Sequence, residues 1–175
     1  RDQPRSRGLG DVYKRQVFDN PDLRMLVVQL ANYGPASDRP QASGWAALRE
    51  VQRRTVATDA KAGLAVTIDV GDRYDIHPSN KQEVGRRLAL EARRLDGQAI
   101  ARPVQPEGVR RVGGELRVRY ADDAGLIVVG ASRPVGFQLC DAGEDCRFVD
   151  AALEGDEVVL AGSRASDAKV RFCWG

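Results

Sequence analysis

The chain has 175 residues, 42% of them hydrophobic, which suits one or two small domains with an apolar core. Its net charge of +2 comes from residues 1–16, whose five basic and two acidic side chains sum to +3. The remainder sums to −1, so the body of the chain offers no basic surface for a nucleic acid. No apolar run approaches the roughly 20 residues of a membrane span.

Residues 1–16 lack both apolar periodicity and the apolar stretch of a signal peptide. Their ending, residues 11–16 (DVYKRQ), resembles translated sequencing-adapter sequence, and we expect a non-native tail outside the fold. The alternative is a disordered basic arm. At the other end, residues 169–175 stop inside a predicted strand, so we expect the chain to be a fragment of a longer protein.

The next part of the chain alternates predicted strands and helices. Residues 25–30 (MLVVQL) and 64–70 (LAVTIDV) are short apolar runs, typical of strands buried on both faces of a parallel sheet. Apolar residues recur at helical spacing over 45–56 and again over 81–95, which predicts two amphipathic helices. This order predicts an α/β fold over residues 17–97, the C-terminal part of a doubly wound parallel sheet.

The pattern changes after residue 97. Residues 98–114 are rich in proline and glycine, and no later segment shows helical periodicity. Short strands about 8–12 residues apart are predicted instead, over 115–120, 126–129, 135–140, 147–149, 157–160 and 169–174. We therefore expect residues 98–175 to form a small antiparallel β-sandwich domain, truncated at its C-terminus.

The single histidine, His77, follows the second apolar run and stands two residues after Asp75. In an extended segment these side chains share a face, so the Asp75 carboxylate can reach Nδ1 of His77 and leave Nε2 free as a base. Ser79 and Gln82 have capping-box spacing, which predicts a helix directly after the histidine. Active crevices of α/β sheets lie beyond the carboxyl ends of the strands, so the pair is a candidate catalytic dyad. The alternative is a local hydrogen bond in a loop.

The three cysteines point to no metal site. Cys140 and Cys146 flank the turn 141–145 and form a disulfide if their Cα atoms lie within about 7 Å; two reduced side chains are the alternative. Cys173 is expected to fill the core. One histidine and no Cys-x-x-Cys pattern argue against zinc, and no glycine-rich loop follows a strand to bind a nucleotide. No cofactor is expected.

Several phrases of the sequence resemble sialate O-acetylesterases of the SGNH-hydrolase (GDSL-type) class. They are 27–33 (VVQLANY), 45–52 (WAALREVQ), 64–72 (LAVTIDVGD), 75–82 (DIHPSNKQ), 134–139 (PVGFQL), 148–149 (FV) and 170–174 (VRFCW). The resemblance covers essentially residues 20–174. It implies a serine esterase that removes acetyl groups from O-acetylated carbohydrates, with an SGNH-type α/β domain followed by a β domain.

The resemblance assigns His77 as the general base and Asp75 as the residue that orients it, in a Ser-His-Asp mechanism. The family's Gly-Asp-Ser-like nucleophile block and its Gln-Gly-Glu block are both missing here. We therefore expect the parent protein to be an esterase and this fragment to be inactive. Gln29, Asn32 and Trp45 are candidates to line the sugar pocket; packing and turn formation are the alternative for all three.

The family and the possible disulfide both favour an exported protein, periplasmic or extracellular. The competing hypothesis is a non-catalytic carbohydrate-binding or structural module. Its support is the missing nucleophile and the separate β domain. Recovery of the upstream coding sequence separates the two, because a Gly-Asp-Ser or Gly-x-Ser block after a strand favours the esterase.

Overall fold

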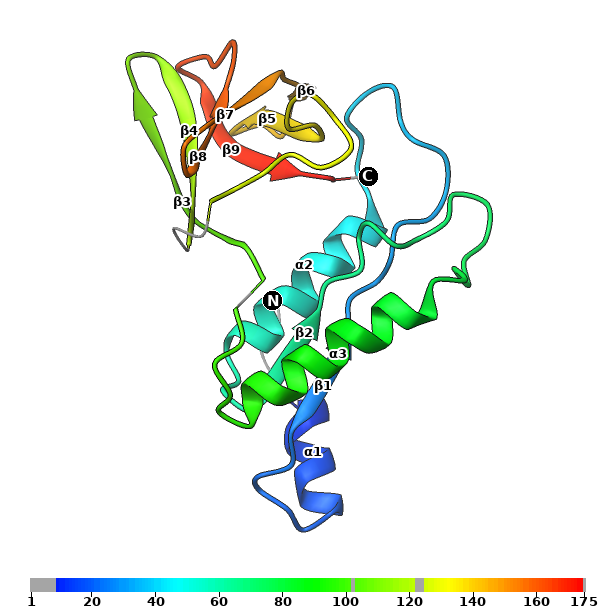
Figure 1. Cartoon of the computed structure of the whole chain (residues 1–175). Coiled ribbons are helices and arrows are strands. Elements are labelled where there is room, and N and C mark those ends of the chain that lie inside the picture. Colours follow the sequence, from blue (N-terminus) through cyan, green and yellow to red (C-terminus); the bar gives the residue numbers. More distant parts are fainter. Residues whose placement is uncertain (1–8, 102, 122–124, 175) are drawn as a thin grey trace. The chain divides into compact units, whose positions relative to one another are not determined.

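The computed structural model describes residues 9–101, 103–121 and 125–174 (Figure 1). The elements in chain order are α1 (Leu9–Val17), β1 (Met25–Val28), α2 (Gly44–Ala57), β2 (Ala62–Ala65), α3 (Lys81–Leu95), β3 (Gln105–Val112), β4 (Glu115–Ala121), β5 (Phe137–Asp141), β6 (Cys146–Phe148), β7 (Ala151–Glu154), β8 (Glu157–Leu160) and β9 (Asp167–Phe172). Among these residues, no helix has the length and apolar character needed to cross a membrane.

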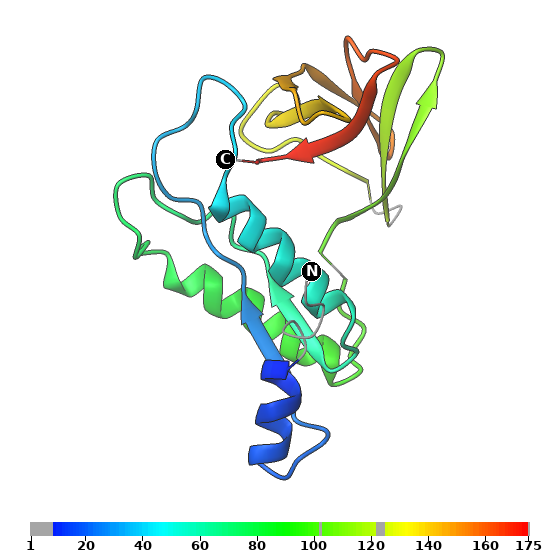
Figure 2. The same cartoon turned by 180° about the vertical axis from the view of Figure 1, so that it is seen from behind.

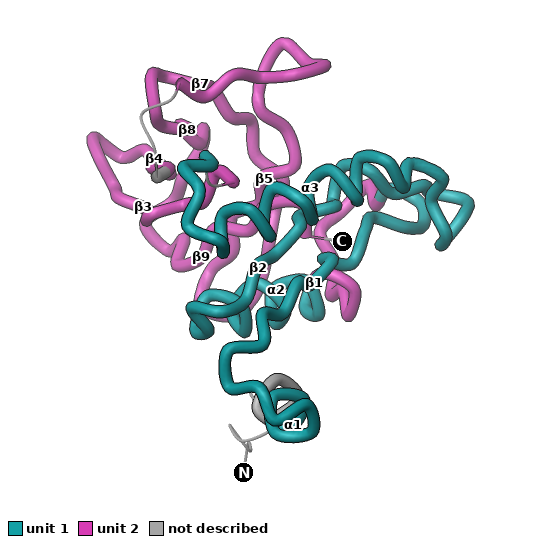
Figure 3. The backbone as a smooth tube through the Cα atoms, turned by 60° about the horizontal axis from the view of Figure 1, so that its bottom comes forward, with its two compact units in different colours: residues 1–36, 47–101 teal, residues 37–46, 102–175 magenta. Residues whose placement is uncertain are grey.

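The chain divides into two compact units (Figure 3). Unit 1 comprises residues 1–36 and 47–101, and unit 2 comprises residues 37–46 and 102–175. Unit 1 holds the helices, except for residues 44–46 at the start of α2, and one pair of strands, whereas unit 2 holds all the later strands.

Unit 1 is built on the parallel pair β1–β2, which α2 and α3 flank (Figures 1 and 3). All four residues of β2 are buried. Its small side chains let α3 approach closely: a Cβ on Gly63 would lie 2.9 Å from Oε2 of Glu91, which is itself buried. The backbone N–H of Gln29 continues the ladder beyond β1 by donating to the carbonyl of Ala65 (2.9 Å).

The prediction of a doubly wound parallel sheet was wrong. Within the described residues β1–β2 is the one parallel pair of strands, and the other strands form small antiparallel sheets ordered β3-β4-β8-β7 and β6-β5-β9. The apolar run 64–70 misled the prediction, because its strand ends at Ala65 and Val70 N–H closes a turn onto the carbonyl of Thr67 (3.2 Å). Thr67, which is 0% exposed, lies in that turn and outside the strand.

Unit 2 packs its two antiparallel sheets around one apolar core. The buried members of that core are Leu116, Val118, Phe137, Leu139, Ala151, Val158 and Leu160, contributed by strands of both sheets. Residues 126–129 were predicted as a strand but form no regular element. β3 and β7 were not predicted: β3 contains Pro106 and a bulge before Gly108, and β7 has only four residues.

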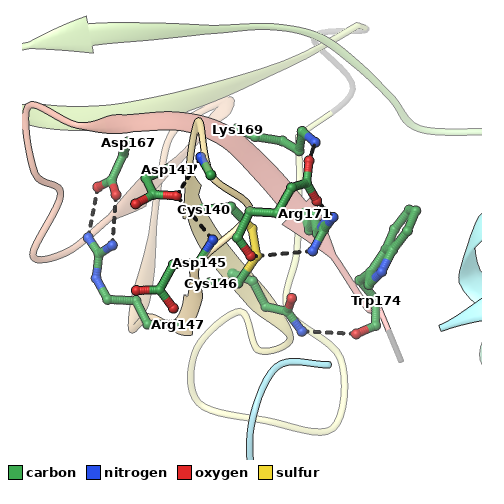
Figure 4. Close-up of a disulfide and its surroundings, with 12 residues drawn as sticks. Cys140, Asp141, Asp145, Cys146, Arg147, Asp167, Lys169, Arg171 and Trp174 are labelled. Carbon is green, nitrogen blue, oxygen red and sulfur yellow. Dashed lines mark hydrogen bonds and ion pairs between the residues drawn. A yellow bond between two sulfur atoms is a disulfide. The ribbon is translucent and has the colours of Figure 1, made fainter. Parts of the chain in front are cut away.

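Cys140 and Cys146 form a disulfide between β5 and β6, which decides the alternative that spacing left open (Figure 4). Their Cα atoms are 4.0 Å apart. The guanidinium of Arg171 lies beside this bond, with Nη1 3.0 Å from the Cys146 sulfur, and also stacks over the ring of Trp174 at 4.7 Å.

Two boundaries differ from expectation. Residues 9–16, assigned to a tail outside the fold, are helical, and Arg15 pairs with Asp59 at 2.8 Å. Their non-native origin stays a prediction, and residues 1–8 lie outside the described residues. Helix α3 begins at Lys81 as predicted, but its N-cap is Asn80, whose Oδ1 accepts from Glu83 N–H (3.3 Å), and not Ser79.

Candidate functional site

The candidate site lies where the chain leaves the carboxyl ends of β1 and β2. Because the strands are parallel, their following loops start from the same end of the pair (Figure 2). Tyr33 and Asp72 continue the parallel pairing as an isolated bridge. Gly34 N–H then donates to the carbonyl of Arg73 (3.2 Å). Residues 71–77, here called the His77 segment, are therefore held beside the loop after β1.

The two candidate catalytic side chains are exposed at the end of this segment. His77 is 87% exposed and Asp75 is 63% exposed. Asp75 Oδ1 accepts the backbone N–H of His77 at 2.7 Å and lies 3.8 Å from its Nδ1. The carboxylate thus makes the local loop hydrogen bond. A catalytic Asp–His bond of about 2.6–3.2 Å requires the imidazole to move roughly 1 Å closer.

Asp72 organises the turn that presents this pair. Its Oδ1 accepts from the backbone N–H of Tyr74 (2.7 Å) and of Asp75 (3.2 Å). An aspartate that bonds backbone groups two and three residues on stabilises a tight turn. Sequence reasoning missed this role, although an aspartate directly after a glycine in the loop that follows a strand was the available signal.

Arg87 of α3 secures the chain just before the His77 segment. Its guanidinium donates to the carbonyl of Val66 (2.7 Å), to both carboxylate oxygens of Asp69 (2.5 and 2.7 Å) and to Glu83 (2.7 Å). These hydrogen bonds lower the pKa of Asp69 against an opposing effect of burial. Hydrogen bonds from Arg86 and Arg87 lower the pKa of Glu83 to about 2. Arg87 itself has a raised pKa, chiefly because of Asp69.

The three predicted sugar-pocket residues lie in different settings. Gln29 is buried, and its carbonyl accepts the hydroxyl of Thr67. Asn32 follows it in the loop after β1, where its Oδ1 accepts from Gly71 N–H (2.7 Å). Trp45 belongs to unit 2, whereas the other candidates belong to unit 1. The structure therefore brings Asn32 to the His77 segment, and a shared pocket with Trp45 stays a prediction.

The remaining features involve other described residues. A cavity of about 280 Å³ in unit 2 is lined by apolar side chains that include Val129, Val135 and Phe172, and none of the residues 71–77 lines it. No cluster of His, Cys, Asp or Glu within the described ranges has the arrangement of a metal site.

No family model matches the chain, and no curated protein matches it. Among solved structures, the chain is similar to the crystal structure of a carbohydrate acetylesterase from Xanthomonas citri, with a TM-score of 0.80 and 33% sequence identity. The match covers 92% of this chain and 38% of the acetylesterase chain. The chain thus spans little more than a third of the length of that protein, and the similarity takes in residues of both units.

Proposed function

We propose that this chain is part of a carbohydrate acetylesterase that hydrolyses acetyl esters on sugar hydroxyls. The observation that carries the proposal is the similarity to the Xanthomonas citri acetylesterase, at 33% identity over 92% of this chain. The finer proposal is a sialate-type O-acetylesterase of the SGNH class whose nucleophilic serine lies outside these 175 residues. It is supported by the family phrases around residues 27–33 and 75–82.

In the proposed mechanism, the serine oxygen attacks the acetyl carbonyl carbon while Nε2 of His77 takes the serine proton. The sugar oxygen then leaves and receives that proton, and an acetyl-serine remains. Water, deprotonated by His77, attacks the acetyl group and releases acetate, and the proton returns to the serine. Asp75 holds Nδ1–H of His77 and stabilises the imidazolium. The 87% exposure of His77 leaves its ring accessible to a nucleophile and an ester.

The sugar-binding residues and the cellular compartment of the protein are proposed on fewer observations. We propose Gln29 as a residue of the sugar pocket, because it lies within the family phrase 27–33. Export to the periplasm or the extracellular space is supported by the Cys140–Cys146 disulfide, since such bonds persist in oxidising compartments.

The test uses the complete gene product that contains this chain. Turnover of 4-nitrophenyl acetate and acetate release from O-acetylated sialic acid and from acetylated xylan are measured. His77→Ala is expected to lower kcat/KM by about a thousandfold or more. Asp75→Asn is expected to lower it by about a hundredfold or more, because the tautomer is no longer selected. Asp156→Asn, in the exposed turn before β8, is the matched control and should match the parent.

Two results contradict the proposal. Turnover by His77→Ala within tenfold of the parent removes His77 as the base. Binding of acetylated sugar by the complete gene product without any acetate release favours the competing function, a non-catalytic carbohydrate-binding module. That alternative has one structural support, the open cavity of about 280 Å³ in unit 2. Preference for sialic acid over xylan tests the finer substrate assignment separately.

A further inference from the structure

The side chain of Asn32 joins the His77 segment to the loop after β1, in addition to the Tyr33–Asp72 bridge and the Gly34–Arg73 backbone hydrogen bond. Asn32 Oδ1 accepts the backbone N–H of Gly71 at 2.7 Å, across 39 residues of sequence. Gly71 is the first residue of the segment that ends in Asp75 and His77. This hydrogen bond therefore fixes the point at which the candidate catalytic residues leave the body of unit 1.

The contact is too close for any residue except glycine at position 71. A Cβ built there would lie 2.0 Å from the backbone oxygen of Asn32 and 2.2 Å from its Oδ1. Contacts under about 3 Å to a backbone atom cannot be relieved by moving a flexible side chain. A loop position requires glycine either because its φ angle is positive or because another backbone approaches closely, and close approach is the reason at Gly71.

Hydrogen bonds from other parts of unit 1 hold the two residues that follow β1, Gln29 and Leu30. Gln52 of α2 accepts the backbone N–H of Leu30 (2.9 Å) through its Oε1. The buried hydroxyl of Thr67 donates to the carbonyl of Gln29. The loop after β1 is thus anchored to α2 on one side and to the chain after β2 on the other. Asn32, in the same loop, connects it to Gly71 through the hydrogen bond to the Gly71 N–H.

After Gly71, a series of hydrogen bonds continues along the His77 segment to the catalytic pair. The Tyr33–Asp72 bridge follows directly, and Asp72 Oδ1 then accepts the N–H groups of Tyr74 and Asp75. Asp75 in turn accepts the N–H of His77 (2.7 Å). Each hydrogen bond orders the next two or three residues, so a disturbance at Gly71 reaches His77.

We propose that Asn32 is a positioning residue for the catalytic pair, which it holds in place through Gly71, and that it does not bind the sugar. The proposal rests on the proposed esterase function. A sugar ligand would use the amide N–H₂ of Asn32 as a donor, whereas positioning uses its Oδ1 as an acceptor. Aspartate keeps the acceptor and lacks the donor, so Asn32→Asp separates the two roles.

The experiment compares Asn32→Ala, Asn32→Asp and Asn20→Ala in the complete gene product, by hydrogen exchange and by 4-nitrophenyl acetate and acetylated-sugar kinetics. Asn20 is the matched control because its Oδ1 also accepts a loop N–H, that of Asp22 (2.9 Å), before β1 and away from the His77 segment. Asn32→Ala is expected to speed exchange of the Gly71 amide about tenfold or more. It is expected to lower kcat about tenfold to a hundredfold with KM within about twofold.

Asn32→Asp is expected to restore Gly71 protection and kcat to within about threefold of the parent, and Asn20→Ala to match the parent in both measurements. Unchanged Gly71 exchange in Asn32→Ala overturns the proposal. So does a raised KM for the sugar substrate with unchanged kcat, or failure of aspartate to rescue. If the parent protein shows no esterase activity the proposed function fails, while hydrogen exchange still decides whether Asn32 holds the segment.

Discussion

Replacing Asp167 by asparagine is expected to destabilise unit 2 in a pH-dependent way. Asp167 begins β9, and its side chain is only 1% exposed. It accepts two hydrogen bonds of 2.7 Å from the guanidinium of Arg147 on β6 (Figure 4). It also accepts one of 2.6 Å from Arg164 N–H. These contacts tie together the two edge strands of the sheet β6-β5-β9.

The magnitude follows from the pKa of Asp167, which the hydrogen bonds from Arg147 lower from 3.8 to about 2. A shift of this size corresponds to at most about 2.5 kcal/mol of stabilisation at neutral pH. Arg147 is 25% exposed, so water compensates part of the lost interaction. We therefore expect Asp167→Asn to lower the free energy of unfolding by about 1–2 kcal/mol at pH 7.

The sign of the pH dependence is fixed because the folded-state pKa is the lower one. The carboxylate contributes its full stabilisation above the unfolded value of 3.8, and loses it as the pH falls towards 2. At pH 3 about half of the contribution should remain. The difference between parent and Asp167→Asn should therefore shrink between pH 5 and pH 3.

Urea unfolding followed by tryptophan fluorescence measures this difference, since both tryptophans, Trp45 and Trp174, belong to unit 2. Asp150→Asn is the matched control, because Asp150 pairs with Arg133 at 3.0 Å while 69% exposed. It should change stability by less than about 0.5 kcal/mol. An equally small loss in Asp167→Asn, or a loss that stays constant down to pH 3, would refute the reasoning.

Three further outcomes are expected. Reducing the Cys140–Cys146 disulfide, which closes a loop with a sequence separation of 6, should lower the stability of unit 2 by about 2 kcal/mol in urea unfolding, and loss of Cys173 by mutation to serine should not reproduce this. Leu139→Ala removes a side chain that is 0% exposed and should cost about 3 kcal/mol by the same measurement; a cost under about 1 kcal/mol would contradict the described core. Arg87→Met should cost unit 1 about 1 kcal/mol at pH 7. The cost should shrink as the pH falls below 4, because the carboxyl of Asp69 has a lowered pKa in the parent alone and therefore takes up its proton at a higher pH in the variant. Urea unfolding followed by circular dichroism at pH 7 and pH 3 checks this, and an equal cost at both would contradict the assigned role.

The elements that the sequence predicted well depend on local patterns. Helix α3 occupies 81–95, as the three-to-four-residue spacing of its apolar side chains indicates. Strand β8 occupies 157–160, where glycine at 155 marks the preceding turn. In both segments the residues that decide the structure lie within a few positions of one another. Single-sequence reasoning reads such information directly.

The errors arise where distant residues decide. The run 64–70 has strand composition, yet pairing stops at Ala65, and beyond it the hydroxyl of buried Thr67 donates to the carbonyl of Gln29, 38 residues away. Strand β3 carries a proline and is mostly exposed, and it forms because β4 supplies a partner. Pairing partners of this kind are not encoded in local spacing, which is why the sheet architecture was predicted wrongly.

The candidate site divides in the same way. The sequence alone identified Asp75 and His77, because one histidine two residues after a carboxylate is visible in any reading of the chain. It left the Cys140–Cys146 bond open, and it left two roles open for Asn32, in the sugar pocket or in packing and turn formation. Only the tertiary structure showed that the two sulfur atoms form one bond. It also showed that Asn32 accepts a hydrogen bond from Gly71, 39 residues further along the chain. Residue types name the chemistry that is available, and long-range packing decides which atoms meet.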